Sequence, residues 1–257
     1  MSASARATTL GLAVAAVLAG AAPVSGLPLG RVSRVAPAVR GMVVGRNGTI
    51  LFAVRTLRAS ATTVTVGRRR CAVAAGTPLA LLAAIRRVGG PSFALRDYGR
   101  CGRSPANSGQ LFVYSLGGEA NSGVNGWEYK LDGAAGSTGA GDPSGPRGNG
   151  RLLRSGEHVL WFWCVAAGGG CERTLEVAPA ASRVPAGGSL AVTVRGYDNE
   201  GHGRPIAGAI VTLGSDAATT DTAGRASLIA PATPGSFQIS AARQGLVPSF
   251  PQTIVVG

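Results

Sequence analysis

The chain has 257 residues, enough for one large domain or two modest ones, each with a core of its own. Forty glycines and fifteen prolines, against only 14% charged residues, disfavour a helical bundle or a coiled coil. Only two histidines are present, which argues against histidine-based catalysis and histidine-rich metal sites.

The formal net charge of +13 is spread unevenly along the chain. Residues 1–105 hold fifteen arginines and a single acid, whereas residues 106–257 hold ten basic and eleven acidic side chains. All of the excess positive charge therefore lies upstream of Ser104.

Residues 1–26 have the pattern of a secretory signal. Arg6 supplies the positive start, residues 10–18 (LGLAVAAVL) are an apolar run, and residues 19–21 (AGA) offer the small side chains of a cleavage site. The run is shorter than the roughly 20 residues needed to cross a bilayer. An Ala-rich tail is the alternative. We predict a secreted protein, extracellular or at the cell surface, with no transmembrane anchor.

The first segments after the signal are short and extended. Residues 27–39 contain proline and arginine and are expected to form a mobile lead-in. Residues 48–66 are rich in β-branched and apolar side chains, which predicts two short strands joined near residues 56–60.

One helix is predicted, over residues 78–88. Thr77 is a suitable N-cap, and Pro78 occupies the first helical position, where its missing N–H costs nothing. Apolar residues recur on one face, and Arg86 and Arg87 lie in the last turn, where cations suit the helix dipole. A Gly-Gly-Pro sequence ends the helix.

Short strands follow the helix. They are predicted at residues 92–95, 110–115, 126–131, 158–164 and 173–177. Residues 133–150 contain so many glycines that they read as a long loop, and such loops are either functional or disordered.

Four cysteines fit an exported protein, because disulfides persist outside the reducing cytosol. Three connectivities are possible. Only the turn-like sequence VAAGGG separates Cys164 from Cys171, so a local bridge is the simplest interpretation and Cys71 then pairs with Cys101. A zinc site is disfavoured because no C-x-x-C spacing occurs.

The sequence between residues 111 and 164 contains a series of ordered motifs. The strand LFVYS is followed by NGWEYKLDG, a glycine-rich loop and LLRSGEHVLWFWC. This series resembles the transcobalamin-like C-terminal domain of many secreted bacterial proteins. The matching residues are Gly126, Trp127, Tyr129, Asp132, Gly133, Ser155, Gly156, Glu157 and Trp161.

The resemblance covers residues 40–177 and implies a β-grasp-like sheet crossed by one helix. The capped helix at Thr77 and Pro78 stands where that family places its helix. The chain contains no counterpart of the large helical barrel that accompanies this domain in animal transcobalamins, so we do not infer cobalamin binding.

The second half is regular and contains no cysteine. Residues 178–188 are expected to form a hinge, and residues 189–257 show five-to-seven-residue strands separated by Gly, Pro and Asp turns, which is typical of a small β-sandwich. The sequences PIAGA, TTDTAGRA and ARQG resemble immunoglobulin-like or carboxypeptidase-regulatory-like modules. We therefore predict a mainly β protein: a β-grasp-like α+β domain with one helix, then an immunoglobulin-like β-sandwich.

Aromatic residues suggest one candidate ligand site. Trp127 and Tyr129 share one strand face, and Trp161 lies on the aromatic strand that follows the loop. Together with the polar Asn125, they could form a shelf for a flat organic ligand or a sugar. The alternative is that these rings are the core of the domain.

Arginines suggest a second candidate site, at Arg68, Arg69 and Arg70. Nucleic-acid binding is disfavoured by export, by the lack of aromatic residues among the arginines and by the lack of a recognisable motif. Attraction to anionic components of the bacterial envelope is preferred, and an ordinary solvated basic face is the alternative.

Neither histidine is accompanied in the sequence by the other residues that a catalytic triad or dyad would need. His158 is expected to be exposed at the start of a strand, and His202 follows Asp198 and Glu200 in a loop whose spacing matches no full calcium loop. With both bridges formed, no cysteine is left as a nucleophile. We predict no enzyme activity, cofactor or metal site.

The prediction is a secreted, non-enzymatic binding or adhesion module acting at the bacterial cell envelope. The alternative is a soluble extracellular carrier of a small flat organic ligand or sugar that uses the aromatic shelf. The expected partners are anionic envelope components or a small organic ligand, and not nucleic acid.

Overall fold

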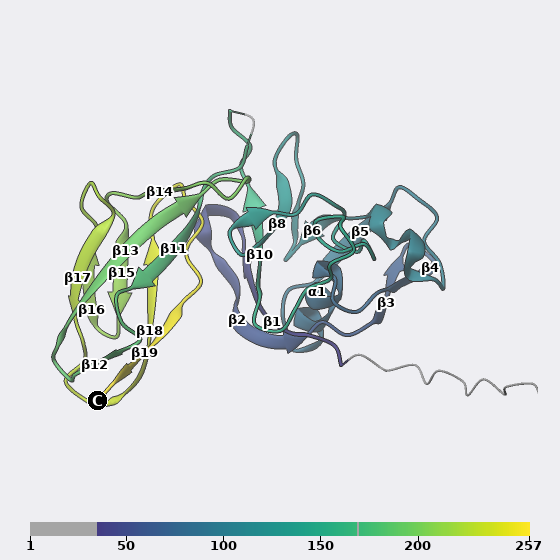
Figure 1. Ribbon diagram of the computed structural model, residues 1–257. Helices are drawn as coiled ribbons and strands as arrows, with labels where there is room; N and C mark the ends of the chain where they lie inside the picture. The colour runs from purple at the N-terminus through teal and green to yellow at the C-terminus, as the bar shows by residue number, and fades with distance from the viewer. Residues whose placement is uncertain (1–34, 169) are drawn as a thin grey trace, which may run out of the picture. The chain divides into compact units, whose positions relative to one another are not determined.

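The computed structural model describes residues 35–168 and 170–257 (Figure 1). The predicted signal at residues 1–26 and the lead-in as far as residue 34 lie outside the described residues. Val35–Gly257 form one compact unit that is mainly β. No helix among the described residues has the length and apolar character that crossing a membrane requires.

We divide this compact unit into an N-terminal lobe and a C-terminal lobe. The elements of the N-terminal lobe are β1 (Ala38–Val44), β2 (Ile50–Arg58), β3 (Thr62–Val66), β4 (Arg69–Val73), α1 (Pro78–Arg87), β5 (Phe93–Asp97), β6 (Leu111–Leu116), β7 (Glu119–Ala120), β8 (Gly126–Leu131), β9 (Ala134–Ala135) and β10 (His158–Cys164), with the 3-10 helices η1 (Arg46–Gly48) and η2 (Pro105–Gln110).

The elements of the C-terminal lobe are all strands. They are β11 (Thr174–Pro179), β12 (Arg183–Val184), β13 (Ser189–Tyr197), β14 (Gly203–Pro205), β15 (Ile210–Leu213), β16 (Asp216–Thr219), β17 (Arg225–Ile229), β18 (Gly235–Ala242) and β19 (Gln252–Val256).

The N-terminal lobe is built on a mixed sheet with the strand order β2-β1-β10-β8-β9. β1 and β2 form an antiparallel pair, and β10 returns to lie parallel to β1. This order, with α1 between the first and last pairs, is that of a β-grasp fold. The sequence did not indicate β1, whose first residues Ala38 and Val39 fall in the expected lead-in; Val39 is fully buried.

α1 lies against one face of this sheet. Its N-cap is Thr77, whose hydroxyl accepts a hydrogen bond from the Ala80 N–H at 3.2 Å, as the sequence predicts. A Cβ at Gly41 of β1 would lie 3.0 Å from the Ile85 side chain, so glycine allows the helix to approach. All residues from Pro78 to Ile85 are buried, because β3, β4, β5 and β6 cover the side of the helix away from the sheet.

The glycine-rich segment at residues 133–150 is part of this core. The Ala140 carbonyl accepts a hydrogen bond from the Leu79 N–H at 2.8 Å, which satisfies a donor of the first helical turn. The Tyr129 hydroxyl donates to the Thr138 carbonyl at 2.9 Å. The segment therefore covers the start of α1.

The sheet is buried on both faces. Met42, Leu160 and Phe162 point away from α1 and form a small core with Val247 and Phe250 of the C-terminal lobe. This explains why every residue of the sequence VLWFWC in β10 is buried.

The C-terminal lobe is an immunoglobulin-like β-sandwich. One sheet has the order β11-β13-β14, with β17 also paired to β13, and the other has the order β12-β19-β18-β15-β16. Alternate residues of β13, among them Leu190, Val192 and Val194, enter the core between the sheets.

The connection between the lobes differs from the expected hinge at residues 178–188. β11 pairs with β13 along its whole length, so the strand predicted to close the first domain, with Ala178 and Pro179, belongs to the sandwich. Arg183 and Val184 pair with β19. Composition suggested a hinge at residues 178–188, but backbone pairing places β11 and β12 at the edges of the two sheets of the sandwich.

Both expected disulfides are present. Cys71–Cys101 joins β4 to the loop after β5, and Cys164–Cys171 closes the turn between β10 and β11.

Candidate functional site

The predicted basic residues lie at the β3–β4 hairpin, far along the N-terminal lobe from the sandwich (Figure 1). Gly67 takes the left-handed conformation at the turn, with φ +58°, and Arg68 follows it at the tip. Arg68, Arg69 and Arg70 are all exposed.

Further arginines join these three in space. The Cys71–Cys101 disulfide and a 2.7 Å hydrogen bond from the Ala72 N–H to the Gly102 carbonyl hold the loop after β5 beside β4. α1 ends next to β3, and a groove of about 450 Å³ lies between them. The resulting basic end consists of the exposed residues Arg68, Arg69, Arg70, Arg86, Arg87, Arg96, Arg100 and Arg103.

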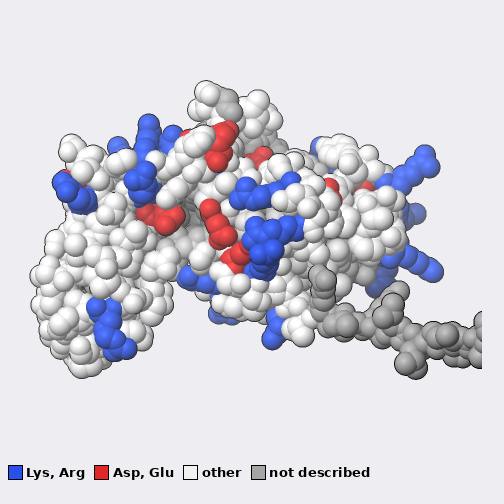
Figure 2. Space-filling view, viewed as in Figure 1, with Lys and Arg blue, Asp and Glu red and all other residues white. Residues whose placement is uncertain are grey.

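The basic end has almost no compensating negative charge. Asp97 is the only acid in residues 59–118, and its side chain is 1% exposed. It accepts hydrogen bonds from the Gly99 and Cys101 N–H groups and binds Arg69 at 2.9 Å. Within residues 35–168 and 170–257, one arginine of these eight is therefore paired with a carboxylate. Figure 2 shows blue side chains projecting from this end of the lobe.

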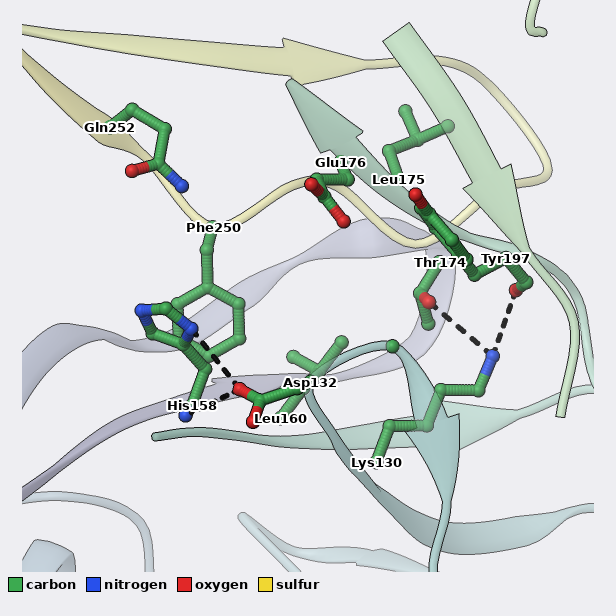
Figure 3. A pocket seen from close by; sticks show the side chains of 11 residues that line it. Lys130, Asp132, His158, Leu160, Thr174, Leu175, Glu176, Tyr197, Phe250 and Gln252 are labelled. Atoms are coloured by element: carbon green, nitrogen blue, oxygen red, sulfur yellow. Dashed lines mark hydrogen bonds and ion pairs between the residues drawn. The ribbon is translucent and has the colours of Figure 1, made fainter. Parts of the chain in front are cut away.

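A second polar site lies where the two lobes meet, in a cleft of about 330 Å³ that we call the interlobe cleft (Figure 3). β8, its turn and β10 form one side, and β11, β13 and the segment leading into β19 form the other. Its lining residues are Lys130, Asp132, Gly133, His158, Leu160, Thr174, Leu175, Glu176, Tyr197, Phe250 and Gln252.

Lys130 is the only lysine of the chain and is 1% exposed. Its Nζ donates hydrogen bonds across the lobe boundary, to Thr174 Oγ1 at 3.3 Å and to the Tyr197 carbonyl at 2.9 Å. It also lies 5.5 Å from the centre of the Phe162 ring. Burial lowers the pKa of Lys130 to about 8, although the nearby Asp198 opposes this shift.

Asp132 and His158 form a fixed pair beside Lys130. Asp132 takes φ +46° in the two-residue Asp-Gly turn between β8 and β9, and its Oδ1 accepts a hydrogen bond from the His158 N–H at 2.9 Å. His158 Nδ1 lies 3.3 Å from the same oxygen. Burial tends to raise the pKa of Asp132, but the hydrogen bonds from His158 bring it below its usual value.

Arg40 determines the tautomer of His158. Its Nη1 lies 2.9 Å from His158 Nε2, and since arginine can only donate, Nε2 is the acceptor and the proton is on Nδ1. The other Arg40 nitrogen donates to the Pro251 carbonyl at 2.7 Å. Both ring nitrogens of His158 are thus engaged, one with Asp132 and the other with Arg40.

His158 is not the exposed histidine that the sequence suggested. Its side chain is 32% exposed and its ring centre lies 5.2 Å from that of Phe250, because the C-terminal lobe covers this end of β10.

The second histidine lies near the acids identified in the sequence. Ligand atoms of Asp198, Glu200 and His202 fall within 4.8 Å of one another. Asp198 already binds Arg173 at 3.1 Å and accepts a hydrogen bond from the His202 N–H at 2.7 Å. These contacts account for the loop conformation.

The rings of the aromatic shelf are almost entirely buried and line only a small pocket of about 120 Å³. Trp127, Tyr129 and Trp161 are 3%, 5% and 2% exposed and belong to the core beneath α1, because their strand face is the one that the helix covers. Asn125 Oδ1 accepts a hydrogen bond from the Ala166 N–H and so ties β8 to the turn after β10. The structure thus brings together the predicted arginines but turns the predicted rings inward.

No family model matches the chain. No curated protein matches it either. Among solved structures, the chain is similar to the D00-D0 domain of intimin, with 14% identity over 58% of this chain and 90% of that one and a TM-score of 0.24. It is also similar to the D0-D1 domain of intimin, with 13% identity over 84% of this chain and 96% of that one and a TM-score of 0.27.

Proposed function

We propose that the chain is a secreted, non-enzymatic binding or adhesion module that attaches to anionic components of the bacterial cell envelope through the basic end. The observation that carries the proposal is the charge of that end: it has eight exposed arginines and a single carboxylate, Asp97, which is buried and paired with Arg69. Both disulfides support an oxidising, extracellular location.

Electrostatics favours a polymer or surface over a small anion. The arginines come from the β3–β4 hairpin, the end of α1 and the loop after β5, so they present several charges to one partner at once. A cluster of one sign attracts an opposite surface at long range, and salt weakens that attraction. The groove beside Arg86 and Arg87 also offers the hydroxyls of Thr63, Thr65 and Ser92.

The remaining expectations belong to the same proposal. The β-grasp order of the N-terminal sheet and its single helix support the resemblance of this lobe to the transcobalamin-like C-terminal domain, with the immunoglobulin-like sandwich as the second domain. The carrier alternative has less support, because Trp127 and Trp161 are almost entirely buried and line a pocket of only about 120 Å³.

The test is retention of the protein on purified bacterial envelopes at low salt. Arg68→Glu/Arg70→Glu is compared with Arg183→Glu/Arg243→Glu, which changes the net charge equally at exposed arginines of the C-terminal lobe. At about 1 kcal/mol per basic residue near an anionic surface, we expect at least about a tenfold loss for the first variant and little for the second.

Two results would contradict the proposal. One is that the wild-type protein is not retained at low ionic strength. The other is that both double variants lose retention equally, which would make net charge, and not the basic end, responsible.

A further inference from the structure

The interlobe cleft holds more polar groups than the contact between the lobes uses. Lys130 has three N–H donors, of which Thr174 and Tyr197 take two. Among the described residues, Asp132 Oδ2 and the Gln252 side chain have no hydrogen-bond partner. The cleft therefore offers both donors and acceptors to a third molecule.

The arrangement of these groups indicates the chemistry of the ligand. Asp132 belongs to the turn after β8 and Glu176 to β11, so carboxylates enter the cleft from both lobes (Figure 3). Lys130 and Gln252 add donors between them. A hydroxyl group both donates and accepts, so a molecule with several hydroxyls would match this mixture, whereas an anion would meet two carboxylates.

The apolar part of the lining has a matching shape. Phe250 lines the cleft although part of its ring packs against His158, and Leu160 and Leu175 complete the apolar wall. A volume of about 330 Å³ lies at the lower end of the range for small-molecule sites. A ring with an apolar face and a polar rim, as in a pyranose, would satisfy both parts of the lining.

We propose that the interlobe cleft binds a neutral saccharide unit, with its hydroxyls shared among Lys130, Asp132, Glu176 and Gln252 and its ring against Phe250. This site goes beyond the function proposed above and does not rest on it, because none of its residues belongs to the basic end. Since the cleft is made by both lobes, a bound sugar would also hold the lobes together.

The test is titration of the full chain with glucose, galactose, mannose and N-acetylglucosamine, followed by saturation-transfer NMR at high salt, where envelope attraction is screened. Glucuronic acid is the anionic comparison. Glu176→Gln and Gln252→Ala are the cleft variants. Their matched controls are Glu128→Gln on β8 and Gln238→Ala on β18, which do not line the cleft.

We expect saturable binding of at least one neutral sugar, weakened about fivefold or more by each cleft variant and unchanged by the controls, as for the loss of one hydrogen bond. Glucuronic acid should bind more weakly than its neutral counterpart. The assignment is overturned if none of the four neutral sugars binds, if glucuronic acid binds best, or if cleft and control variants behave alike. Circular dichroism establishes that each variant is folded.

Discussion

The basic end and the interlobe cleft use positive charge in opposite ways. The eight arginines of the basic end are exposed, and among the described residues only Arg69 is ion-paired, so the other seven charges are available to a partner. Lys130 is buried between two lobes, where its Nζ holds Thr174 and Tyr197 in place. The difference shows that the environment of a charge, more than its sign, decides how much of it is left for a partner and how much holds the fold together.

The largest effect is expected when the loop that completes the basic end is released. Cys71→Ala/Cys101→Ala removes the disulfide that holds this loop beside β4. Opening a loop of this length should lower the free energy of unfolding by about 3 to 4 kcal/mol, measured by urea titration. Retention on envelopes should fall as well. An unchanged urea midpoint would show that the core alone holds the loop.

The second prediction contrasts single residues of the two sites. Lys130→Ala leaves a cavity between the lobes and removes the partner of Thr174 and Tyr197, so it should cost about 2 to 4 kcal/mol of unfolding free energy. Arg68→Ala removes only an exposed side chain and should change stability by less than about 0.5 kcal/mol. Equal effects in chemical denaturation would refute the contrast.

The third prediction concerns pH and has the smallest expected effect. Because burial lowers the pKa of Lys130 to about 8, the folded protein binds fewer protons than the unfolded chain between pH 8 and the ordinary lysine pKa near 10.4. The contribution of Lys130 to stability should therefore rise across this window and be constant below it.

The size of this rise should be about 1 to 3 kcal/mol, taken as the difference between wild type and Lys130→Met in unfolding titrations at several pH values. Methionine keeps the volume of the side chain but does not titrate, so other groups cancel in the comparison. A difference that is flat from pH 8 to pH 10, or that falls, would contradict the lowered pKa.

Local patterns were sufficient for much of the fold. Thr77 and Pro78 correctly predicted the start of the helix. Residues 126–131 and 158–164 were predicted as strands with the bounds that they have in the structure. β1 was missed because Arg40 and Gly41 interrupt its apolar pattern. Arg40 is needed to bind Pro251 and His158, and Gly41 is needed to admit α1.

The interlobe cleft was missed although one signal for it existed. The continuous apolar run in β10 indicates a strand buried on both faces, and Lys130 pairs with Leu160 in that strand. A lysine opposite a doubly buried strand must itself be covered. What covers it, however, is Thr174 and Tyr197 of the other lobe, at a distance along the chain that local patterns do not span.

The amino-acid sequence was enough to predict the mainly β class, the capped helix and the concentration of arginine in the first part of the chain, because these depend on composition and on residues close in sequence. It favoured the observed disulfide pairs only as the simplest of three connectivities. Only the tertiary structure decided which face of the sheet α1 covers and what covers the other. Because α1 packs on one face of the sheet, Trp127, Tyr129 and Trp161 are buried in the core. Because the C-terminal lobe packs on the other face, Lys130 lines a cleft.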